Sequence, residues 1–429
     1  MQIKIAKLVY GGDGLARLPA DEHGPGKTLF VPFVLEGEQV EATLTEQKPG
    51  FARARVERII EPSPERIEAA CPYFQRCGGC HYQHANYKTQ LEIKSAILRE
   101  TLLRTAKLEL ADLQVHSSPE WNYRNRTRLK LQTEPHFALG YYKFRSHELL
   151  PIEQCPISSP LINRAIAAIW EMGRNNQIPQ EVREIEFFAD AADGELIIEI
   201  YCTHKTSRTD AQLIAEKLMS ALPEIKGTAV FEELSPNQNR EPKRLAEFGT
   251  PTIDYATQSG SYHVSAGSFF QVNRFLIDEL ISLATGGVSG QLALDLYAGV
   301  GLFATVLARS FAQVIAVEPS QTSYSDLRHN ATPEVKAVRA TTEQYLGQAT
   351  ALRPDLVVAD PPRSGLGENV CRSLAKLDAP RITYVSCDPS TLARDLRTLL
   401  TLGYRIAEAH FVDLFPQTYH IESVFHLAR

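Results

Sequence analysis

Short runs of alternating apolar and polar residues fill the N-terminal part of the chain. Alternation with a period of two is typical of strands that bury one face. A glycine-rich turn at residues 11–14 follows the first run. The runs that predict strands are residues 3–8, 29–31, 39–44 and 54–59. Short strands at this spacing predict a small five-stranded β-barrel over residues 1–60.

The next segment begins with helical rather than alternating spacing. Leu98 and Leu102 fall on one stripe of a helix predicted at about 86–112. Strands and turns follow, interrupted by a second helix predicted over 160–174. We expect a β-rich middle domain over residues 61–250, whose first helix can pack on the domain that follows it.

Apolar runs alternate with helix-length segments in the last part of the chain. The runs are residues 292–296, 314–317, 356–359 and 382–386. Uninterrupted apolar strands separated by helices are typical of a doubly wound parallel sheet. We therefore predict an α/β domain over residues 251–429, with its ligand at the carboxyl ends of the strands.

Composition and charge narrow the class of protein. With 429 residues, 44% of them apolar, the chain is long enough for about three domains with real cores. Its 45 Lys and Arg residues against 51 Asp and Glu residues leave a formal charge of -6, so any nucleic-acid surface must be local. The sequence has neither a signal peptide nor the ~20 apolar residues that span a bilayer, which predicts a cytoplasmic protein without a membrane partner.

The chain contains seven cysteines, and in a reducing compartment they favour metal ligands, a nucleophile or core positions over disulfides. Cys71, Cys77 and Cys80 are closely spaced, and Cys155 is the obvious fourth ligand from a distant segment. Zinc and an iron-sulfur cluster both use four thiolates, so the spacing leaves both open, as well as four buried cysteines without a metal. The cysteines without ligand spacing, which we expect in the core, are Cys202 and Cys371.

Glycines and polar residues follow the apolar runs of the C-terminal domain. Residues 295–301 form a glycine-containing turn, and Glu318 closes the next strand at a distance typical of an acid that binds ribose hydroxyls. This pattern fits NAD as well as S-adenosylmethionine, and it also fits a tight turn without a ligand. Residues 360–363 (Asp-Pro-Pro-Arg) and Cys387 leave the next two strands, so we expect them to face one cleft. A cysteine at such a position is also typical of a core residue.

Four segments, in this order, resemble the motifs of the RNA uracil-5-methyltransferase family. They are residues 295–301 (DLYAGVG), 360–366 (DPPRSGL), 384–395 (YVSCDPSTLARD) and 413–423 (DLFPQTYHIES). The resemblance extends over essentially the whole chain and implies a Rossmann-like, S-adenosylmethionine-dependent methyltransferase domain. Residues 1–60 resemble the TRAM domain, an OB-like RNA-binding barrel that the ribosomal RNA branch carries and the bacterial tRNA branch generally lacks.

The resemblance implies a role for each matching residue. Cys387 is then the nucleophile and Glu422 the general base. The implied contacts for S-adenosylmethionine are Gln271, Tyr297, Glu318 and Asp360. Residues 71–84 resemble the family's [4Fe-4S] segment. The implied ligands of that cluster are Cys71, Cys77, Cys80 and Cys155.

Two residues depart from the family's pattern, which usually has Asn at position 388 and often has Asn at position 302. Asp388 adds a negative charge beside the thiol, which opposes thiolate formation. Leu302 alters the glycine turn that meets the cofactor. His420 and Glu422 should share one face of a strand over 420–427, where desolvation raises the pKa of Glu422; a solvated edge-strand glutamate is the alternative.

The chemistry of uracil methylation needs these groups. Carbon 5 of uracil is a poor nucleophile, so a thiolate adds at carbon 6, the enolate takes the methyl group and a base removes the proton on carbon 5. We expect this reaction on a uridine of 23S rRNA, with the T-loop uridine of tRNA as the alternative substrate. RNA is the expected partner, and neither DNA nor a membrane is. Methylation of an exocyclic base nitrogen and a noncatalytic iron-sulfur RNA-binding protein are further alternatives, but neither needs both Cys387 and Glu422.

Residues 121–147 mix basic and aromatic side chains. Six basic residues stand against one acid, with six aromatic residues between them. Phosphate neutralisation and base stacking need this mixture, so we expect the segment to bind RNA together with the barrel. A solvated amphipathic strand pair is the alternative, because Arg128 and Lys130 alternate with Leu129 and Leu131.

Overall fold

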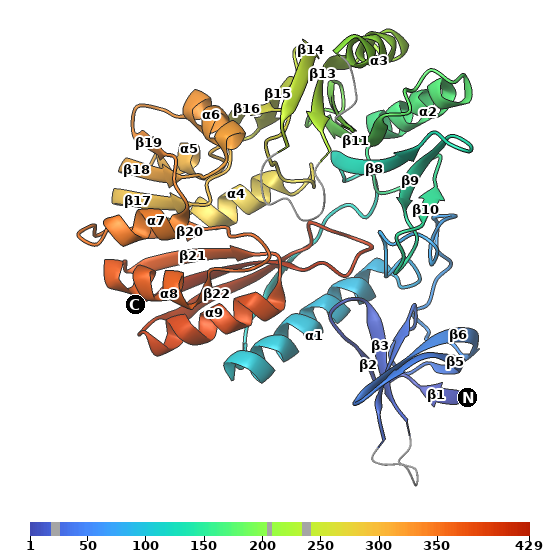
Figure 1. The fold of residues 1–429 in the computed structure, drawn as a ribbon. Helices are drawn as coiled ribbons and strands as arrows, with labels where there is room; N and C mark the ends of the chain where they lie inside the picture. Colours follow the sequence, from blue (N-terminus) through green and yellow to red (C-terminus); the bar gives the residue numbers. More distant parts are fainter. Residues whose placement is uncertain (19–25, 204–207, 234–241) are drawn as a thin grey trace.

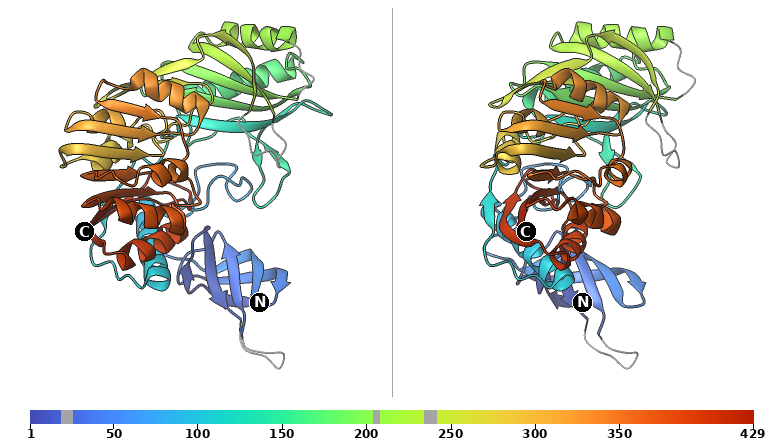
Figure 2. Two further views of the ribbon diagram at one scale, coloured as in Figure 1. Left: turned by 60° about the vertical axis from the view of Figure 1, so that its left-hand side comes forward. Right: turned by 90° about the vertical axis from the view of Figure 1, so that its left-hand side faces the viewer.

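The computed structural model describes residues 1–18, 26–203, 208–233 and 242–429. A small N-terminal barrel, a middle sheet and a larger C-terminal sheet follow one another along the chain, as the colours of Figure 1 show. Both views in Figure 2 place the barrel and the middle sheet at opposite ends of the molecule. Among the helices of the described residues, none is both long enough and apolar enough to cross a bilayer.

The N-terminal sheet has six strands in the order β1-β5-β6-β4-β3-β2. They are β1 (Gln2–Lys4), β2 (Lys7–Leu8), β3 (Asp13–Arg17), β4 (Thr28–Pro32), β5 (Gln39–Lys48) and β6 (Phe51–Glu61). The first predicted strand is split, because its two halves pair with different partners: β1 with β5 and β2 with β3. Since these halves lie at the two ends of the strand order, the sheet closes into a barrel, and Val31, Val40 and Ala52 fill its interior.

The middle sheet has seven strands in the order β10-β9-β8-β11-β12-β13-β14. They are β8 (Arg126–Gln132), β9 (Ala138–Tyr142), β10 (Leu149–Pro151), β11 (Val182–Ala189), β12 (Leu196–Cys202), β13 (Ile225–Glu232) and β14 (Arg244–Gly249). Helices α2 (Pro160–Arg174) and α3 (Arg208–Ala221) pack on it. Helix α2 has the predicted bounds because Ser159 caps its first turn and Pro160 suits its first position.

The C-terminal sheet has eight strands in the order β19-β18-β17-β20-β21-β23-β22-β7. They are β7 (Gln114–His116), β17 (Gly290–Leu296), β18 (Phe311–Val317), β19 (Val335–Val338), β20 (Leu356–Ala359), β21 (Arg381–Ser386), β22 (Arg405–Val412) and β23 (Glu422–Ala428). Only β23 runs antiparallel to its neighbours, β21 and β22. Two hydrophobic cores lie against this sheet. The helices are α4 (Ile277–Thr285), α5 (Ala304–Leu307), α6 (Gln321–Asn330), α7 (Thr342–Gln348), α8 (Gly367–Leu377) and α9 (Pro389–Thr401), and a hairpin of β15 (Thr252–Thr257) and β16 (Gly260–Ser265) precedes them.

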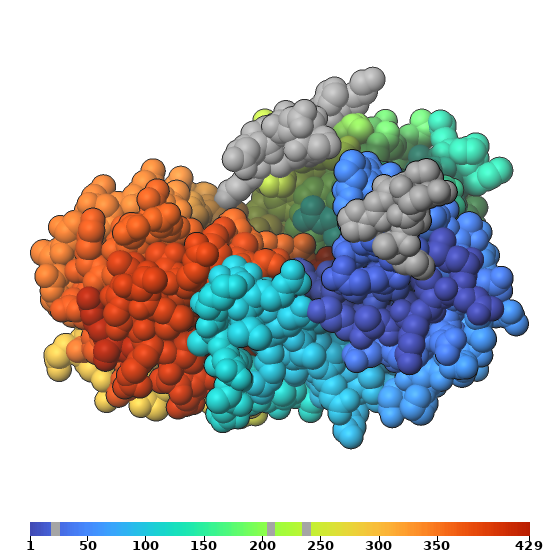
Figure 3. All heavy atoms as spheres, turned by 90° about the horizontal axis from the view of Figure 1, so that it is seen from below, coloured from blue at the N-terminus to red at the C-terminus, as the bar shows by residue number. Residues whose placement is uncertain are grey.

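Helix α1 (Tyr87–Ala106) and strand β7 lie with the C-terminal sheet, although their residues fall within the middle domain that the sequence predicts. Strand β7 pairs in parallel with β22, and α1 packs against α9. Leu98 and Leu102 are buried in the core of the C-terminal domain. Seen from below in Figure 3, α1 lies between this domain and the barrel. The C-terminal domain therefore consists of two segments of the chain: the predicted residues 251–429, and an earlier segment that contains α1 and β7.

Candidate active site

The residues just after four parallel strands meet at one edge of the C-terminal sheet. Strands β17, β18, β20 and β21 are neighbours in the sheet, and their carboxyl ends point the same way. The residues that follow these strands are Tyr297, Glu318, Asp360 and Cys387. The topology thus brings together side chains that lie up to ninety residues apart in sequence, as expected for this kind of sheet.

The glycine turn after β17 has an unusual backbone. Tyr297, Gly299 and Gly301 have φ angles of 64°, 56° and 92°. A positive φ is costly for a tyrosine and is typical of functional sites. The buried carboxylate of Glu318 fixes this turn, because its Oε2 accepts the Gly299 N–H at 2.9 Å. The turn and the end of β18 therefore form one rigid unit.

Gln271 enters this edge from the loop before α4. Its Nε2 donates to Asp360 Oδ2 at 3.4 Å. The side chain is 8% exposed, so the contact is shielded from solvent. The structure thus brings the four residues implied for S-adenosylmethionine to one edge of the sheet.

Asp295 is a further acid of this edge that the sequence reasoning did not single out. It is fully buried at the end of β17, and burial, with the charges of Asp360 and Glu318, raises its pKa to about 8. Its position directly before a glycine turn was the available signal. Three carboxyl groups from adjacent strands therefore gather here, which suits a cationic ligand with ribose hydroxyls.

Cys387 and Glu422 are neighbours across two antiparallel strands. Ser386 pairs with Ser423, so the residues one step beyond, Cys387 and Glu422, lie side by side. Burial, together with Asp360, raises the pKa of Glu422 well above its usual range. Burial, together with Glu422 and Asp360, raises the pKa of the Cys387 thiol to about 12.

Burial also raises the pKa of Asp360, to about 7. Asp360, Cys387 and Glu422 thus oppose one another's ionisation, and a cation placed among them lowers the pKa of each. Arg363 acts in that direction on Cys387. The described residues therefore hold the thiol protonated in the absence of a cationic ligand.

His420 does not share a strand face with Glu422, contrary to the sequence-based expectation. Strand β23 begins at Glu422, and His420 lies in the loop before it. Its Nδ1 lies 3.3 Å from Arg363 Nη2, and its ring packs on Tyr419. Burial and Arg363 lower the pKa of His420 to about 3, so this ring is neutral near pH 7.

The two departures from the family's pattern have structural roles. Asp388 caps α9, because its Oδ1 accepts the N–H groups of Ser390 and Thr391 at 2.9 Å each. Burial and the negative charge of Asp388 raise the pKa of Tyr10 of the barrel, whose ring contacts Tyr419 edge-on. Leu302 is 7% exposed and lies in the hydrophobic core. The negative charge of Asp388 is thus offset by a helix N-terminus and linked to the barrel.

The loop before β23, residues 413–420, is held from three sides. Gln417 O accepts the backbone N–H groups of His81 and Tyr82, at 2.8 and 3.0 Å. The Gln90 side chain of α1 exchanges two hydrogen bonds of 2.9 Å with Gln417. From the middle domain, Tyr123 donates to the carbonyl of Pro416. These contacts fix the path of the loop that leads to Glu422. They join residues far apart in the sequence, so no local sequence pattern predicts them.

The four predicted metal ligands line one cavity of about 700 Å³ in the middle domain. They are Cys71, Cys77, Cys80 and Cys155. Burial and the neighbouring thiols raise the pKa of Cys77 to about 11, while the partly buried Arg124 lowers it. Arg124 Nε has no hydrogen-bond partner in the described part of the chain. Four thiols beside a partly buried cation fit an anionic metal-thiolate centre. Cys202 and Cys371 are buried in hydrophobic cores, as expected.

The basic residues of β8 are engaged within the protein. Arg126 pairs with Glu186 and, at 2.8 Å, with Glu199, and Arg128 also pairs with Glu186. Lys130 pairs with Glu184. These glutamates belong to β11 and β12, more than fifty residues further along the chain, and so lie outside the basic and aromatic segment 121–147. The structure favours the amphipathic strand pair over free phosphate-binding charges for these three basic residues.

Comparisons with known proteins agree with this geometry. Residues 86–429 match the tRNA (Uracil-5-)-methyltransferase family, and residues 1–56 match the TRAM domain. An uncharacterized RNA methyltransferase of Aquifex aeolicus is 33% identical over 433 residues, which cover 99% of this chain and 97% of that protein. The 23S rRNA (uracil(1939)-C(5))-methyltransferase RlmD of Pectobacterium atrosepticum is 30% identical over 436 residues, covering 99% and 92%.

A solved structure has the same fold. It is the Pyrococcus abyssi tRNA (uracil-54, C5)-methyltransferase in complex with S-adenosyl-L-homocysteine, with a TM-score of 0.77 and 23% identity over 100% of both chains. The resemblance inferred from the motifs is thus confirmed over the full length. The chain belongs to the tRNA (uracil-5-)-methyltransferase family, as an S-adenosylmethionine-dependent RNA methyltransferase with an N-terminal TRAM domain.

Proposed function

We propose that this protein methylates carbon 5 of a specific uridine in 23S rRNA through a covalent adduct on Cys387. The observation that carries the proposal is the side-by-side position of Cys387 and Glu422 at the edge where Asp360 also lies. A thiol and a carboxyl group are the two protein groups that this chemistry requires. Methylation of an exocyclic nitrogen needs neither of them.

In the proposed reaction, the thiolate form of Cys387 bonds through Sγ to carbon 6 of the flipped-out uracil, and the electron pair of the double bond between carbons 5 and 6 moves onto the ring as an enolate. Bound S-adenosylmethionine supplies the methyl group to carbon 5. Glu422 then removes the proton from carbon 5, the bond from Sγ to carbon 6 breaks, and the double bond re-forms. Because Asp360 and Glu422 raise the pKa of Cys387, a cationic cofactor beside Asp360 would favour the reactive thiolate.

The residues proposed to hold the cofactor supply complementary groups. Glu318 closes the second strand, where an acid binds ribose hydroxyls, and Asp360 with Gln271 offers a carboxylate and an amide. Tyr297 presents a ring from the strained turn. Asp295 adds a third carboxyl group behind them. This set suits a ligand with a sulfonium, an ammonium group and a ribose.

We further propose that Cys71, Cys77, Cys80 and Cys155 hold a [4Fe-4S] cluster, with zinc as the alternative occupant. The tight spacing of the cysteines, their shared cavity and the Arg124 cation in its wall support a metal centre. The segment that carries three of these cysteines continues directly into His81 and Tyr82, which hold the loop before Glu422. The cluster would therefore brace the active site rather than take part in the chemistry.

The TRAM domain and the RlmD relative support 23S rRNA, whereas the tRNA enzyme with the same fold makes tRNA the second candidate. Mapping 5-methyluridine in both RNAs from a strain that lacks the gene separates them. We expect one position of 23S rRNA to lose its methyl group and to regain it with the wild-type gene but not with the Cys387→Ala variant. Loss in tRNA alone would replace the proposed substrate, and loss in neither would refute the activity.

A further inference from the structure

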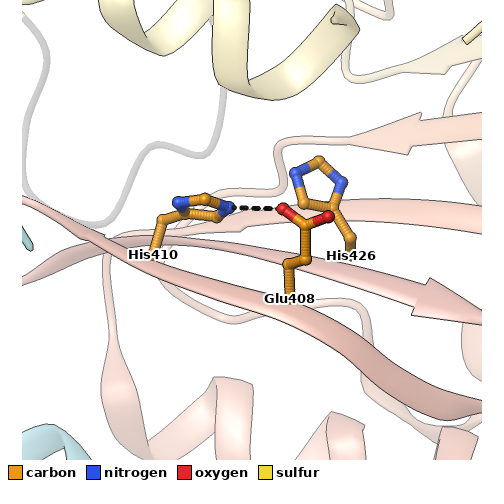
Figure 4. A group of neighbouring side chains, drawn as sticks. All are labelled: Glu408, His410 and His426. Carbon is orange, nitrogen blue, oxygen red and sulfur yellow. Dashed lines mark ion pairs between the residues drawn. The ribbon is translucent and has the colours of Figure 1, made fainter. Parts of the chain in front are cut away.

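Two histidines and a glutamate lie together on strands β22 and β23, on the side toward α4 (Figure 4). Glu408 is opposite His426 in the strand register, and His410 is two positions further on the same face of β22. One ligand atom from each of these residues lies within 4.8 Å of the others. Glu422 is four residues from His426 along β23, roughly 13 Å, so the cluster is separate from the candidate active site.

Hydrogen bonds around the cluster define which ring nitrogen carries a proton. Glu279 Oε1 lies 2.7 Å from His116 Nδ1, and a carboxylate only accepts, so a neutral His116 carries its proton on Nδ1. His116 Nε2 is then an acceptor for His410 Nδ1, 3.1 Å away. This leaves His410 Nε2 with a lone pair. A carboxylate-histidine chain of this kind is typical of the outer shell of metal sites.

The lone pair of His410 faces another acceptor. Among the described residues, buried His410 Nε2 has no hydrogen-bond partner. It points at Glu408 (Figure 4), whose Oε2 lies 3.4 Å away. Two acceptors that face each other require a cation between them. A metal ion or a proton can meet this need, and the proton adds a full positive charge to the hydrogen-bonded pair of His116 and His410, of which His410 is 3% exposed.

We propose that Glu408, His410 and His426 bind a divalent transition-metal ion, with Zn²⁺ as the best fit. Two imidazoles and one carboxylate are a ligand set that Zn²⁺ uses, with water in the fourth position. Thr383 Oγ1 lies 3.2 Å from His426 Nδ1 and orients that ring. The Glu408 side chain is 60% exposed, which opens the site to ions from solvent. The ion would clamp β22 to β23 and, through His116 and Glu279, to β7 and α4.

The test is titration of the full-length protein with Zn²⁺ by calorimetry and with Co²⁺ by visible absorption. Cobalt on nitrogen and oxygen ligands gives visible bands without the near-ultraviolet charge-transfer band of thiolates, which separates this site from the cysteine site. We expect Glu408→Gln and His426→Ala to lose these bands and one equivalent of Zn²⁺ binding. Glu279→Gln, which touches only the outer shell, should weaken Zn²⁺ binding about 10- to 100-fold.

His329→Ala is the matched control, because His329 is an exposed ring stacked on His263 at 4.3 Å and lies outside the cluster. It should bind Zn²⁺ and Co²⁺ like the wild type. Glu408→Gln replaces an exposed side chain by one of the same shape, so its fold should be kept even if His426→Ala unfolds. Equal Zn²⁺ affinity in the wild type and Glu408→Gln, or an equal loss in His329→Ala, would overturn the proposal.

Discussion

At the scale of single residues, carboxyl groups govern the chemistry of the candidate site. Asp295 and Glu422 are buried and Asp360 is partly buried, and loss of solvent raises the pKa of each carboxyl group. Natural proteins rarely bury several carboxyl groups together without a ligand or a reaction that uses them. The raised pKa of Cys387 follows from the same acids. The site is thus arranged to change its ionisation when a cation enters.

In the proposed mechanism, Cys387→Ala and Glu422→Gln should block the reaction at different steps. Without a thiol no adduct forms, so Cys387→Ala should bind RNA and cofactor but neither methylate nor crosslink. Glu422→Gln should accumulate a methylated RNA-protein adduct, because the proton on carbon 5 is not removed. A denaturing gel with methyl-labelled cofactor shows the difference as label retained on the protein. Equal retention in both variants would mean that the nucleophile or the base is wrong.

The raised pKa of Asp295 predicts a pH dependence of stability. The folded state binds this proton up to about pH 8, whereas an ordinary aspartate has a pKa of 3.8. Its contribution is therefore fully present below the lower value and is lost as the pH rises through the upper one. Urea unfolding between these values should show a steeper fall for the wild type than for Asp295→Asn, by up to about 1.4 kcal/mol per pH unit. The exposed Asp112→Asn should behave as the wild type, and parallel curves for the wild type and Asp295→Asn would contradict the prediction.

At the scale of elements, α1 and the loop at 413–420 form one structural unit. Lys94 of α1 pairs with Asp413 at 2.7 Å, with both side chains fully buried, and donates to the carbonyl of Phe415. Burial lowers the pKa of Lys94, while Asp413 raises it. The pair anchors the start of the loop that ends at Glu422.

Removing one partner of the Lys94–Asp413 ion pair should lower the stability of the protein. Lys94→Met leaves the Asp413 carboxylate buried without its cation, which we expect to reduce the free energy of unfolding by about 3–5 kcal/mol. The double variant Lys94→Met/Asp413→Leu should recover much of that loss, because no unpaired charge remains. Lys88→Met, in an exposed pair with Glu92 on the same helix, should change stability by only about 0.5 kcal/mol or less. Denaturant unfolding of the three variants measures these changes. A loss of unfolding free energy in Lys94→Met similar to that in Lys88→Met would refute the role of the buried pair.

At the scale of the whole molecule, three remote segments converge on the active site. The barrel reaches it through Tyr10, the cysteine segment through His81 and Tyr82, and the middle domain through Tyr123. Figure 1 shows these parts of the chain around the C-terminal ends of the strands. Domains that contribute contacts to one loop of an active site are expected to affect turnover without touching substrate.

A cluster at the four cysteines should therefore influence turnover. Anaerobically purified protein should be brown, with about four iron atoms per chain. Cys80→Ala should lose iron and turnover but keep cofactor binding by calorimetry, because the proposed cofactor residues belong to the C-terminal sheet. Cys387→Ala is the matched control, since it removes a cysteine outside the cluster and should keep its iron. Stoichiometric zinc without iron would contradict the cluster and leave a structural zinc site.

Local sequence patterns predicted much of the fold, because the apolar spacing and the caps that define a strand or a helix lie within that element. The strand runs at 292–296 and 382–386 lie within β17 and β21, and α2 begins and ends where its cap and apolar spacing indicate. The motifs that follow the strands were also readable, since parallel strands bring their carboxyl ends to one edge. These features depend on residues within a few positions of one another.

Only the tertiary structure decided which distant groups meet. Strand β23 lies antiparallel between β21 and β22, which places Glu422 beside Cys387 and leaves His420 outside the strand. In the fold, Arg126 pairs with glutamates of β11 and β12. These pairs neutralise part of the positive charge that residues 121–147 carry when that segment is considered alone. The tertiary structure also assembled Glu408, His410 and His426 from two strands and their partner His116 from a third. Strand order and pairing between remote segments depend on the packing of the whole chain, so no local spacing encodes these contacts.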